Sequence, residues 1–387
     1  MSSVRKRTLP SGQTRWQVDY RDRAGTRRHK QFRTKSEAVT YETKVRSEIV
    51  AGTHVADSAS MTVHEAGELW LARAEREGLE YGTFRQYRQH LQLHIDPLIG
   101  STKLSKLTTP SIEKFRDDLL ASRSRPLSRA ILTSLKGILK EAKRLGGIGH
   151  NPAAETMVGG SRRHKEEVVI PTKDQIRAVL AKSTELWPLT RVEMTRTRQQ
   201  KIVAVCWRPL IVTAIFSGLR CSELRGLTWP HVDLDCRVIE VRQRADFQNV
   251  MGPPKTAAGY RDVPMAPMVA NTLKSWKLAC PKTPLDLVFP TKNGTIHSNG
   301  NIHKRCWGPL LRSLGIVGVD GRTALTLHSL RHAAASLFIE QKMSPKKVQV
   351  VMGHSSIQVT FDIYGHLFST PDDDQQAMAQ IEARLLA

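Results

Sequence analysis

The sequence has no C-x-x-C pair, no long apolar run and no excess of acidic residues. Its five cysteines are odd in number and widely spaced, which argues against a disulfide framework and predicts reduced thiols. The apolar run at residues 210–216 is far too short to span a bilayer, and no apolar segment follows the basic N-terminus as it would in a secretory signal. We therefore expect an intracellular protein without a membrane anchor.

Acidic residues are the scarcer charge, with 36 Asp and Glu against 59 Lys and Arg, so the formal net charge is +23. A positive field of this size attracts polyanions and raises their rate of encounter. The charge favours DNA or RNA as the partner over a surface that is basic only for solubility. The length of 387 residues predicts two or three domains, because one domain usually holds about 100–200 residues.

The first fifty residues hold 13 Lys and Arg against 5 Asp and Glu. Alternating Trp16, Val18 and Tyr20 predict a strand, and a second extended run passes through residues 30–32. A helix is predicted next, because Thr34 and Glu37 fit a capping box. Basic strands can enter a DNA groove or follow its phosphates, and the alternative is a solvated sheet face. The candidate DNA contacts here are Arg21, Arg23, Arg27, Arg28 and Lys30.

Four helices are predicted over the next hundred residues. The first begins after Thr62, which fits a capping box with Glu65. The other three are expected at about residues 83–95, from residue 109 onward and at residues 126–145. Four helices of this length predict a bundle. Its basic residues are candidate DNA contacts, although such residues are also common on helix faces that are merely solvated. These candidates are Arg85, Arg88, Lys136 and Lys140.

Residues 159–165 lack apolar periodicity and predict an interdomain linker, in which Arg162 and Arg163 suit a strap across DNA. Past Pro171 the sequence predicts a mostly helical segment that contains an extended hairpin at residues 237–265. Residues 251–255 interrupt this hairpin, so Lys255 is expected at a turn.

Candidate catalytic residues follow one another through this segment, and each matches a need of DNA strand cleavage. Arg220 and Arg331 can bind the non-bridging oxygens of a phosphate as permanently charged forks. Tyr364 can attack phosphorus as a covalent nucleophile, and Lys255 can protonate the leaving oxygen. No cluster of acidic metal ligands accompanies them. The full set is Arg220, Lys255, His328, Arg331, His354 and Tyr364, with Glu223 placed to orient Arg220 or its helix.

This order of residues resembles the catalytic apparatus of the tyrosine recombinases, in particular phage-type integrases similar to lambda integrase. The resemblance is most specific at residues 213–227 and 326–367, and the departures at Ser329, Ala333 and Met352 remove no catalytic group. It implies an arm-type DNA-binding domain at residues 1–57, a core-binding helical domain at 58–158, a linker at 159–170 and a catalytic domain with a C-terminal tail helix at 171–387.

The fold implied by the resemblance is multidomain and mainly α. It has a small N-terminal three-stranded sheet with one helix, a central SAM-like four-helix bundle, and a mostly α catalytic domain with a small antiparallel sheet. In the family the tail helix packs on a neighbouring subunit, and packing on its own domain is the alternative.

The implied function is site-specific recombination that integrates or excises a phage or mobile element. The reaction passes through a 3′-phosphotyrosyl intermediate and a Holliday junction, on double-stranded attachment sites held by a homotetramer. The resemblance implies no cofactor or metal and a place in the bacterial cytoplasm at the nucleoid. It leaves open whether an excisionase or a DNA-bending protein must assist. Two rivals are a relaxing enzyme similar to type IB topoisomerases and a non-catalytic DNA-binding regulator.

Overall fold

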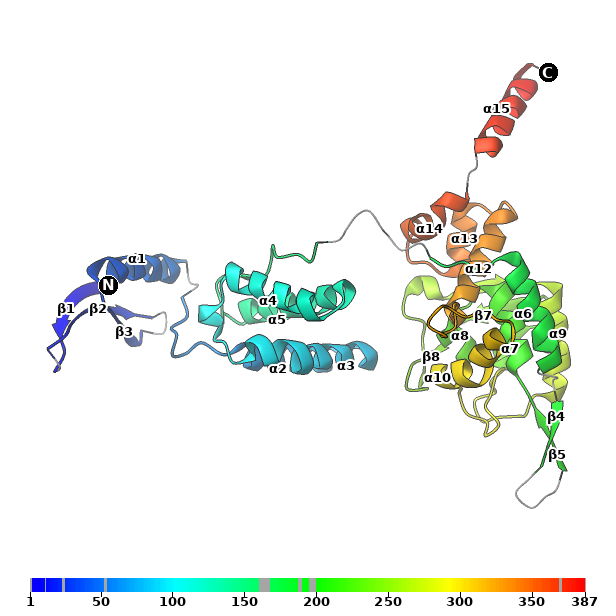
Figure 1. The fold of residues 1–387 in the computed structure, drawn as a ribbon, viewed down its shortest axis with the longest axis horizontal. Coiled ribbons are helices and arrows are strands. Elements are labelled where there is room, and N and C mark those ends of the chain that lie inside the picture. Colours follow the sequence, from blue (N-terminus) through cyan, green and yellow to red (C-terminus); the bar gives the residue numbers. More distant parts are fainter. Residues whose placement is uncertain are drawn as a thin grey trace. The chain divides into compact units, whose positions relative to one another are not determined.

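The structure is a computed structural model that describes residues 2–10, 12–22, 25–51, 54–159, 168–186, 190–194, 200–368 and 371–386. The chain forms two compact units, Met1–His164 and Lys165–Ala387, which are called the first and second units below. The predicted fold class is confirmed. A three-stranded antiparallel sheet comes first, a group of helices follows, and the second unit is mostly helical with small sheets (Figure 1).

The N-terminal sheet has the order β1-β2-β3, and both of its pairings are antiparallel. One helix, α1, packs on the sheet through Ala38 and Val45, which meet Val18 and Tyr20 in a small core. The predicted capping box between Thr34 and Glu37 is present at the start of that helix. The elements are β1 (Ser3–Thr8), β2 (Thr14–Arg21), β3 (Arg27–Phe32) and α1 (Lys35–Val50).

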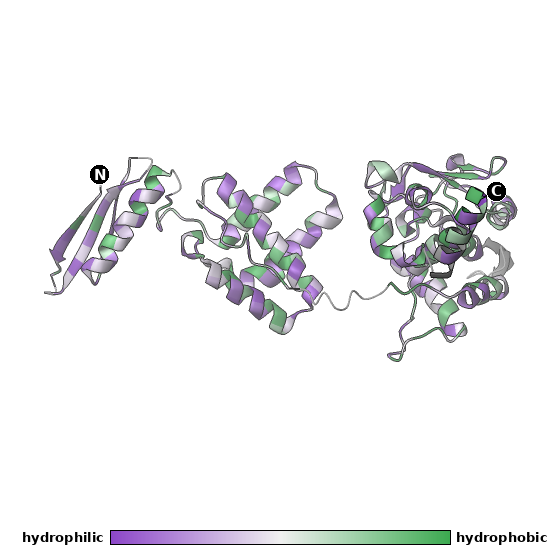
Figure 2. Cartoon of the chain, turned by 90° about the horizontal axis from the view of Figure 1, so that it is seen from above, coloured by the Kyte–Doolittle hydropathy of each residue, from purple (hydrophilic) through white to green (hydrophobic). Residues whose placement is uncertain are grey.

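The predicted helical bundle follows, and the capping box between Thr62 and Glu65 opens it as expected. Its helices carry hydrophobic residues on the sides that meet and hydrophilic residues elsewhere (Figure 2). The elements are α2 (Val63–Arg76), α3 (Tyr81–His90), η1 (Leu91–Gly100), η2 (Leu104–Lys106), α4 (Thr109–Ser122) and α5 (Arg125–Arg144).

The second helix of the bundle is longer than its sequence predicts. It begins at Tyr81 and continues past residue 95 to Gly100 as the wider, π-type helix η1. Pro97 lies inside this stretch and has no N–H to donate to the preceding turn. A π-type register is one way for a helix to continue past a residue that breaks the usual hydrogen-bond ladder.

The helix α7 (Trp207–Ser217) lies in the core of the second unit, and its residues are buried almost all round, as expected of a central helix. The other helices are α6 (Lys173–Leu186), α8 (Cys221–Arg225), η3 (Trp229–His231), η4 (Ala257–Gly259), α9 (Pro267–Ala279), α10 (Asn299–Ile302), η5 (His303–Trp307), α11 (Gly308–Ser313), α12 (Leu327–Glu340), α13 (Pro345–Met352), α14 (Ile357–Tyr364), η6 (Gly365–Leu367) and α15 (Pro371–Leu386).

The predicted hairpin at residues 237–265 is present as an antiparallel pairing of β7 with β10, and a smaller hairpin, β8 with β9, lies within it. A further hairpin, β4 with β5, was not predicted from the sequence. The strands are β4 (Thr190–Met194), β5 (Gln200–Ala204), β6 (Val232–Asp233), β7 (Val238–Val241), β8 (Arg244–Ala245), β9 (Met251–Gly252) and β10 (Arg261–Pro264).

The C-terminal end of α13 closes in a Schellman motif. Gly353 adopts the left-handed conformation with φ of 65°, and its N–H donates to the carbonyl of Val350. The N–H of His354 donates to the carbonyl of Gln349, one turn back. The motif turns the chain sharply, so that His354 and then α14 follow directly on the end of α13.

We predict that Gly353→Ala destabilises the protein more than Gly315→Ala. Both glycines have positive φ, so a Cβ at either position costs about 1–2 kcal/mol in strain. At Gly353 the added Cβ would also lie 2.9 Å from the carbonyl oxygen of Ala258 and 2.9 Å from Nη1 of Arg261, whereas at Gly315 it meets nothing within 4 Å. Thermal unfolding of the full chain measures both variants, and equal losses would contradict the close packing at Gly353.

Candidate active site

Three arginines gather at the C-terminal end of α13. The carbonyl oxygens of residues 351, 352 and 353 accept, in that order, from Nε of Arg261 at 2.7 Å, from Nη2 of Arg331, and from Nη2 of Arg220 at 2.6 Å. The last carbonyls of a helix have no partner within it and carry the negative end of its dipole. The end of α13 therefore fixes three guanidinium groups that come from three other elements.

Glu223 supplies the counter-charge that this cluster needs. Its carboxylate accepts from Nη1 of Arg220 at 2.8 Å and from Nη2 of Arg261 at 2.8 Å, and it also accepts the backbone N–H of Arg220 at 2.8 Å. Burial acts to raise the pKa of Glu223, but the arginines and the backbone bond outweigh it, and the pKa is lowered. The carboxylate is thus ionised, and it lies where it can orient Arg220.

Arg331 and Arg220 differ in how far they are open to solvent. Arg331 is buried on α12 and donates from Nη1 to the carbonyl of Gly218 as well as to α13. Burial and the nearby Arg220 lower the pKa of Arg331 to about 9, so it remains charged at neutral pH. The side chain of Arg220 is 35% exposed and can reach a ligand from its open side.

Tyr364 is the last residue of α14 and is only 1% exposed. Its hydroxyl lies 2.7 Å from Nδ1 of His332, and its ring stacks on His354 with centroids 6.3 Å apart and planes at 14°. Burial raises the pKa of Tyr364 to about 12, although Arg331 acts to lower it. The phenol is therefore protonated in this arrangement, and its oxygen lies within hydrogen-bond distance of a histidine.

His332 was not among the site residues predicted from the sequence. Burial, His328 and Arg331 together lower the pKa of the His332 imidazole to about 4, so at neutral pH its ring is neutral and can accept a proton from Tyr364. A signal was available in the sequence, since His332 follows His328 by one helical turn and would share its face of α12. The two rings meet edge to face, with centroids 4.8 Å apart.

The other predicted histidines border the same group. His328 is exposed near the start of α12, and Thr326 opens that helix in a capping box with Ser329. His354 is buried directly after the α13 turn, and its Nδ1 bonds the hydroxyl of Thr360 at 2.9 Å. Burial together with the neighbouring arginines lowers the pKa of His354 to about 4.

Lys255 is exposed in the short segment between β9 and η4, which agrees with its predicted place at a turn. Pro254 packs so closely on Gly259 that a Cβ at Gly259 would lie 2.4 Å from the proline ring. The carbonyl of Gly259 accepts from Nη1 of Arg261 at 3.0 Å. One arginine thus joins the base of the lysine segment to Glu223 and to the end of α13.

Two parts of the chain match known protein families. Residues 190–370 match the model of the phage integrase family, and residues 62–120 match that of the N-terminal SAM-like domain of phage integrases. The chain belongs to the phage integrase family. It is a tyrosine recombinase of the lambda-integrase type, an enzyme of site-specific recombination.

Relatives match this recombinase over most of its length. A tyrosine recombinase XerC-like protein of Caldanaerobacter subterraneus subsp. tengcongensis is 24% identical over 375 residues, 90% of each chain. The ICEBs1 integrase of Bacillus subtilis is 23% identical over 349 residues, 87% of each chain.

Solved structures share the fold of the recombinase. The Tn1549 transposon integrase in complex with transposon right end DNA has a TM-score of 0.67 at 21% identity, over 83% of this chain and 100% of that one. A lambda integrase tetramer bound to a Holliday junction has a TM-score of 0.56 at 19% identity, over 91% of this chain and 95% of that one.

The structure divides the candidate DNA contacts of the N-terminal sheet between its two faces. Lys30 and Arg28 pair with Val18 and Tyr20, so they lie on the α1 side of the sheet. Nζ of Lys30 bonds Asp57 at 2.6 Å, and Nε of Arg28 bonds Asp22 at 2.9 Å. Their engagement in the protein makes them weaker candidates.

Arg21 and Arg27 pair with each other on the opposite face of the sheet, and both are exposed. They remain predicted DNA contacts of the recombinase. Arg23 lies outside the described residues, as do Arg162 and Arg163 in the predicted linker.

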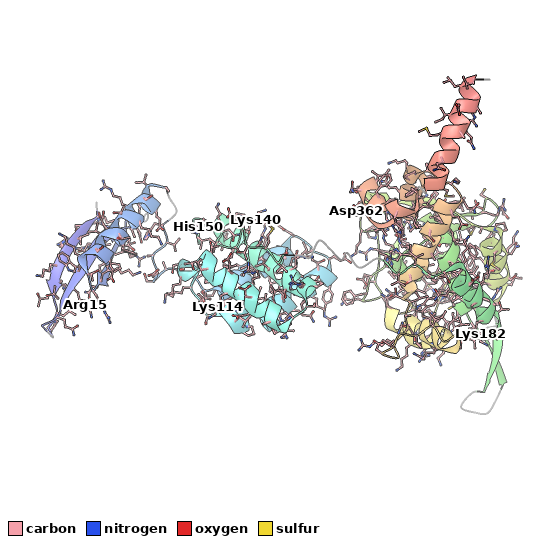
Figure 3. All side chains as sticks on the ribbon, turned by 45° about the horizontal axis from the view of Figure 1, so that its top comes forward. Arg15, Lys114, Lys140, His150, Lys182 and Asp362 are labelled. Carbon is pink, nitrogen blue, oxygen red and sulfur yellow. The ribbon has the colours of Figure 1, made fainter. Side chains whose placement is uncertain are left out.

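The helical part of the first unit keeps its basic candidates mostly exposed. Arg85, Arg88 and Lys140 are exposed, and Lys140 is labelled on α5 in Figure 3. Lys136 donates from Nζ to the carbonyl of Ala154 at 2.9 Å, which ties α5 to the chain that leaves it. The first three remain predicted phosphate contacts because they are exposed, and Lys136 is a weaker candidate because of its bond to Ala154.

The described residues contain neither a metal-binding cluster nor a membrane-spanning helix. No group of three or more His, Cys, Asp or Glu within them could hold a metal ion. Among the helices that the structure describes, none is both long enough and apolar enough to cross a membrane.

We predict that Glu223→Gln destabilises the recombinase by about 3–5 kcal/mol, the range for removing one partner of a buried ion pair. The change would leave Arg261, whose side chain is 2% exposed, without its counter-charge. Glu340→Gln is the matched control, because Glu340 pairs with Lys173 at the surface and its loss costs less than about 1 kcal/mol. Denaturant unfolding of the full chain compares the two, and similar losses would contradict the buried network.

We predict that the stability of the recombinase falls as the pH is lowered from 6.5 towards 4. The pKa values of His297, His332 and His354 are each lowered to about 4 in the fold, chiefly by burial. An unfolded histidine has a pKa of about 6.5, so in this window the unfolded chain binds more protons than the folded one. The stabilisation is complete above pH 6.5 and is lost as the pH falls through 4.

The melting temperature between pH 7.5 and pH 5 tests this sign, and His332→Gln should flatten part of the slope. A melting temperature that stays constant or rises as the solution is acidified would show that these imidazoles are not buried as neutral groups.

Proposed function

We propose that Tyr364 cleaves double-stranded DNA by forming a 3′-phosphotyrosyl bond, and that the recombinase uses this step to integrate or excise a mobile element. One observation carries the proposal. The hydroxyl of Tyr364 lies 2.7 Å from a neutral histidine on α12, and the neighbouring end of α13 gathers Arg220 and Arg331. A nucleophile, a proton acceptor and paired cations thus meet in one place.

In the cleavage step the phenol oxygen of Tyr364 bonds to phosphorus while its proton passes to Nδ1 of His332. The bond from phosphorus to the 5′ oxygen breaks, its electron pair goes to that oxygen, and Lys255 delivers a proton there. Arg220 and Arg331 bind the non-bridging oxygens, whose negative charge grows in the transition state. The reverse sequence rejoins the strand, because the phosphotyrosyl bond keeps the energy of the phosphodiester.

Deprotonation of Tyr364 is expected to depend on the bound substrate. With its pKa near 12 the phenol is almost fully protonated at neutral pH, and the residue is 1% exposed. Binding of a DNA phosphate by the two arginines would bring the electrophile to the hydroxyl. His332 then takes the proton only when attack occurs, which protects a reactive group in the absence of substrate.

The parts of the chain outside the site fit DNA-binding roles. We assign residues 1–57 to arm-type sites, 58–158 to core sites and 171–387 to catalysis, with 159–170 as the linker. The basic charge of the chain and the exposed Arg21, Arg27, Arg85, Arg88 and Lys140 support contacts with phosphates. Phosphate contacts predict a salt-sensitive affinity for any DNA duplex. Recognition of the base sequence must come from other side chains.

We infer that four copies act on paired attachment sites and exchange strands through a Holliday junction, as the bound lambda integrase tetramer suggests. The tail helix α15 supports an assembly, because Met378, Ile381 and Leu385 share an exposed apolar stripe. Packing of this stripe on a neighbouring copy would cover it. The reaction belongs to the bacterial cytoplasm at the nucleoid, and an excisionase or a DNA-bending protein is a candidate helper.

We predict that Tyr364→Phe abolishes covalent complexes with a nicked suicide substrate while DNA affinity stays within about threefold of wild type, since only the nucleophile is removed. Gel separation of denatured complexes measures the first, and fluorescence anisotropy the second. Tyr260→Phe is the control, because Tyr260 is an exposed tyrosine of the same unit and should keep full activity. Covalent complex from Tyr364→Phe, or its loss from Tyr260→Phe, would move the nucleophile elsewhere.

The two rival functions give different results in the same assays. A relaxing enzyme would remove supercoils from plasmids without any attachment site as fast as from specific substrates. A non-catalytic regulator would bind DNA tightly and form no covalent complex on any junction between element and host.

A further inference from the structure

Arg225 is a buried cation whose hydrogen-bond acceptors are neutral oxygens. It is the last residue of α8, 2% exposed, and it donates from Nε to the carbonyl of His297 and from Nη2 to the carbonyl of Asp246 at 2.9 Å. Nη2 also donates to the side chain of Asn249. Burial of a charge costs free energy, so these bonds indicate that the side chain serves to fix the positions of the segments it contacts.

The acceptors at Asp246 and Asn249 belong to the turn that joins β8 to β9. The carboxylate of Asp246 accepts the backbone N–H groups of Gln248 and Val250, both at 2.8 Å, and Asn249 has a φ of 65°. These features shape the turn from within. Arg225 then holds the shaped turn against the end of α8.

The first strand of this hairpin lies directly on the residue after Arg225. A Cβ at Gly226 would be 2.5 Å from the backbone nitrogen of Ala245, so β8 and the end of α8 are in close contact. Ala245 is fully buried with Leu287 and Ile296 beneath the hairpin. The hairpin is therefore packed against the end of α8 through β8, and Arg225 holds its turn through hydrogen bonds.

A short series of contacts connects the β8–β9 hairpin to the segment that carries Lys255. Nε of Arg244, on β8, donates to the carbonyl of Pro253 at 3.1 Å, two residues before the lysine. Pro254 then packs on Gly259, whose carbonyl Arg261 holds. Contacts therefore hold the chain on both sides of Lys255. On one side they reach α8 through β8, and on the other through Arg261 and Glu223.

We propose that Arg225 is a positioning residue that fixes the β8–β9 hairpin so that Lys255 is held in register with Arg220 at the scissile phosphate. This role rests on the proposed function, in which Lys255 protonates the leaving 5′ oxygen as the bond to phosphorus breaks. Arg225 touches neither DNA nor the reacting atoms in this account. It acts through its bonds to the turn at residues 246–250.

A suicide substrate with sulfur in place of the bridging 5′ oxygen separates this role from general support of the site. A thiol has a pKa of about 8.5, far below that of an alcohol, so a thiolate leaves without an acid. Loss of general-acid catalysis slows cleavage by about 100-fold or more with oxygen and should cost little with sulfur. Lys255→Ala provides the reference for this pattern.

We expect Arg225→Lys to slow single-turnover cleavage of the oxygen substrate by at least about 10-fold, since a lysine cannot reach three acceptors, and to cleave the sulfur substrate within about threefold of wild type. Asn249→Gly is a milder second variant, because glycine tolerates the positive φ and removes only one acceptor. It should show the same selectivity, at smaller size, even if Arg225→Lys folds poorly. Arg322→Lys, at an exposed arginine, is the matched control and should match wild type on both substrates.

Three outcomes would overturn the proposal. Equal slowing on both substrates by both variants would mean that Arg225 supports Arg220 or the whole fold rather than Lys255. Unchanged cleavage of the oxygen substrate by both variants would mean that the hairpin needs no such tie. If Lys255→Ala itself shows no preference for sulfur, the assignment of Lys255 as the acid fails together with the positioning role.

Discussion

The arrangement of this site depends on the unpaired carbonyls at the end of α13. They bind Arg261, Arg331 and Arg220 in sequence, and the left-handed Gly353 then directs the chain into His354 and α14. Guanidinium groups repel one another, so they stay together only because a helix terminus and the buried Glu223 offset their charge. The cationic site is therefore built before any phosphate arrives, which is what electrostatic preorganisation requires.

The short helix α8 connects the arginine cluster to the opposite side of the site, where Lys255 lies. Arg220 caps its start, Glu223 lies within it, and Arg225 ends it. Through these three residues one turn of helix contacts the α13 terminus and the hairpin that carries Lys255. The nucleophile comes from elsewhere, since Tyr364 ends α14 and bonds His332 of α12. The proton acceptor His332 and the proton donor Lys255 are thus held by different elements of the fold.

Local signals in the sequence were sufficient for much of this. The capping boxes at Thr34 and Thr62 are short-range patterns, and the structure contains both of them. Arg225 and Arg261 could not be identified in this way, because their partners, apart from Gly259, lie 21 to 90 positions away in sequence. The β4–β5 hairpin was missed among residues assigned to a mostly helical segment. The two faces of the N-terminal sheet depend on strand register, which the sequence pattern left open.

The central claim is that Tyr364 carries the cleaved strand through its 3′ phosphate. Protease digestion of the covalent complex, followed by mass spectrometry of the DNA-linked peptide, tests it directly when the suicide substrate is labelled on either side of the cut. The account predicts an adduct on Tyr364 that retains the label upstream of the cut and releases a strand with a free 5′ hydroxyl. An adduct on another residue, or one joined to a 5′ phosphate, would contradict it.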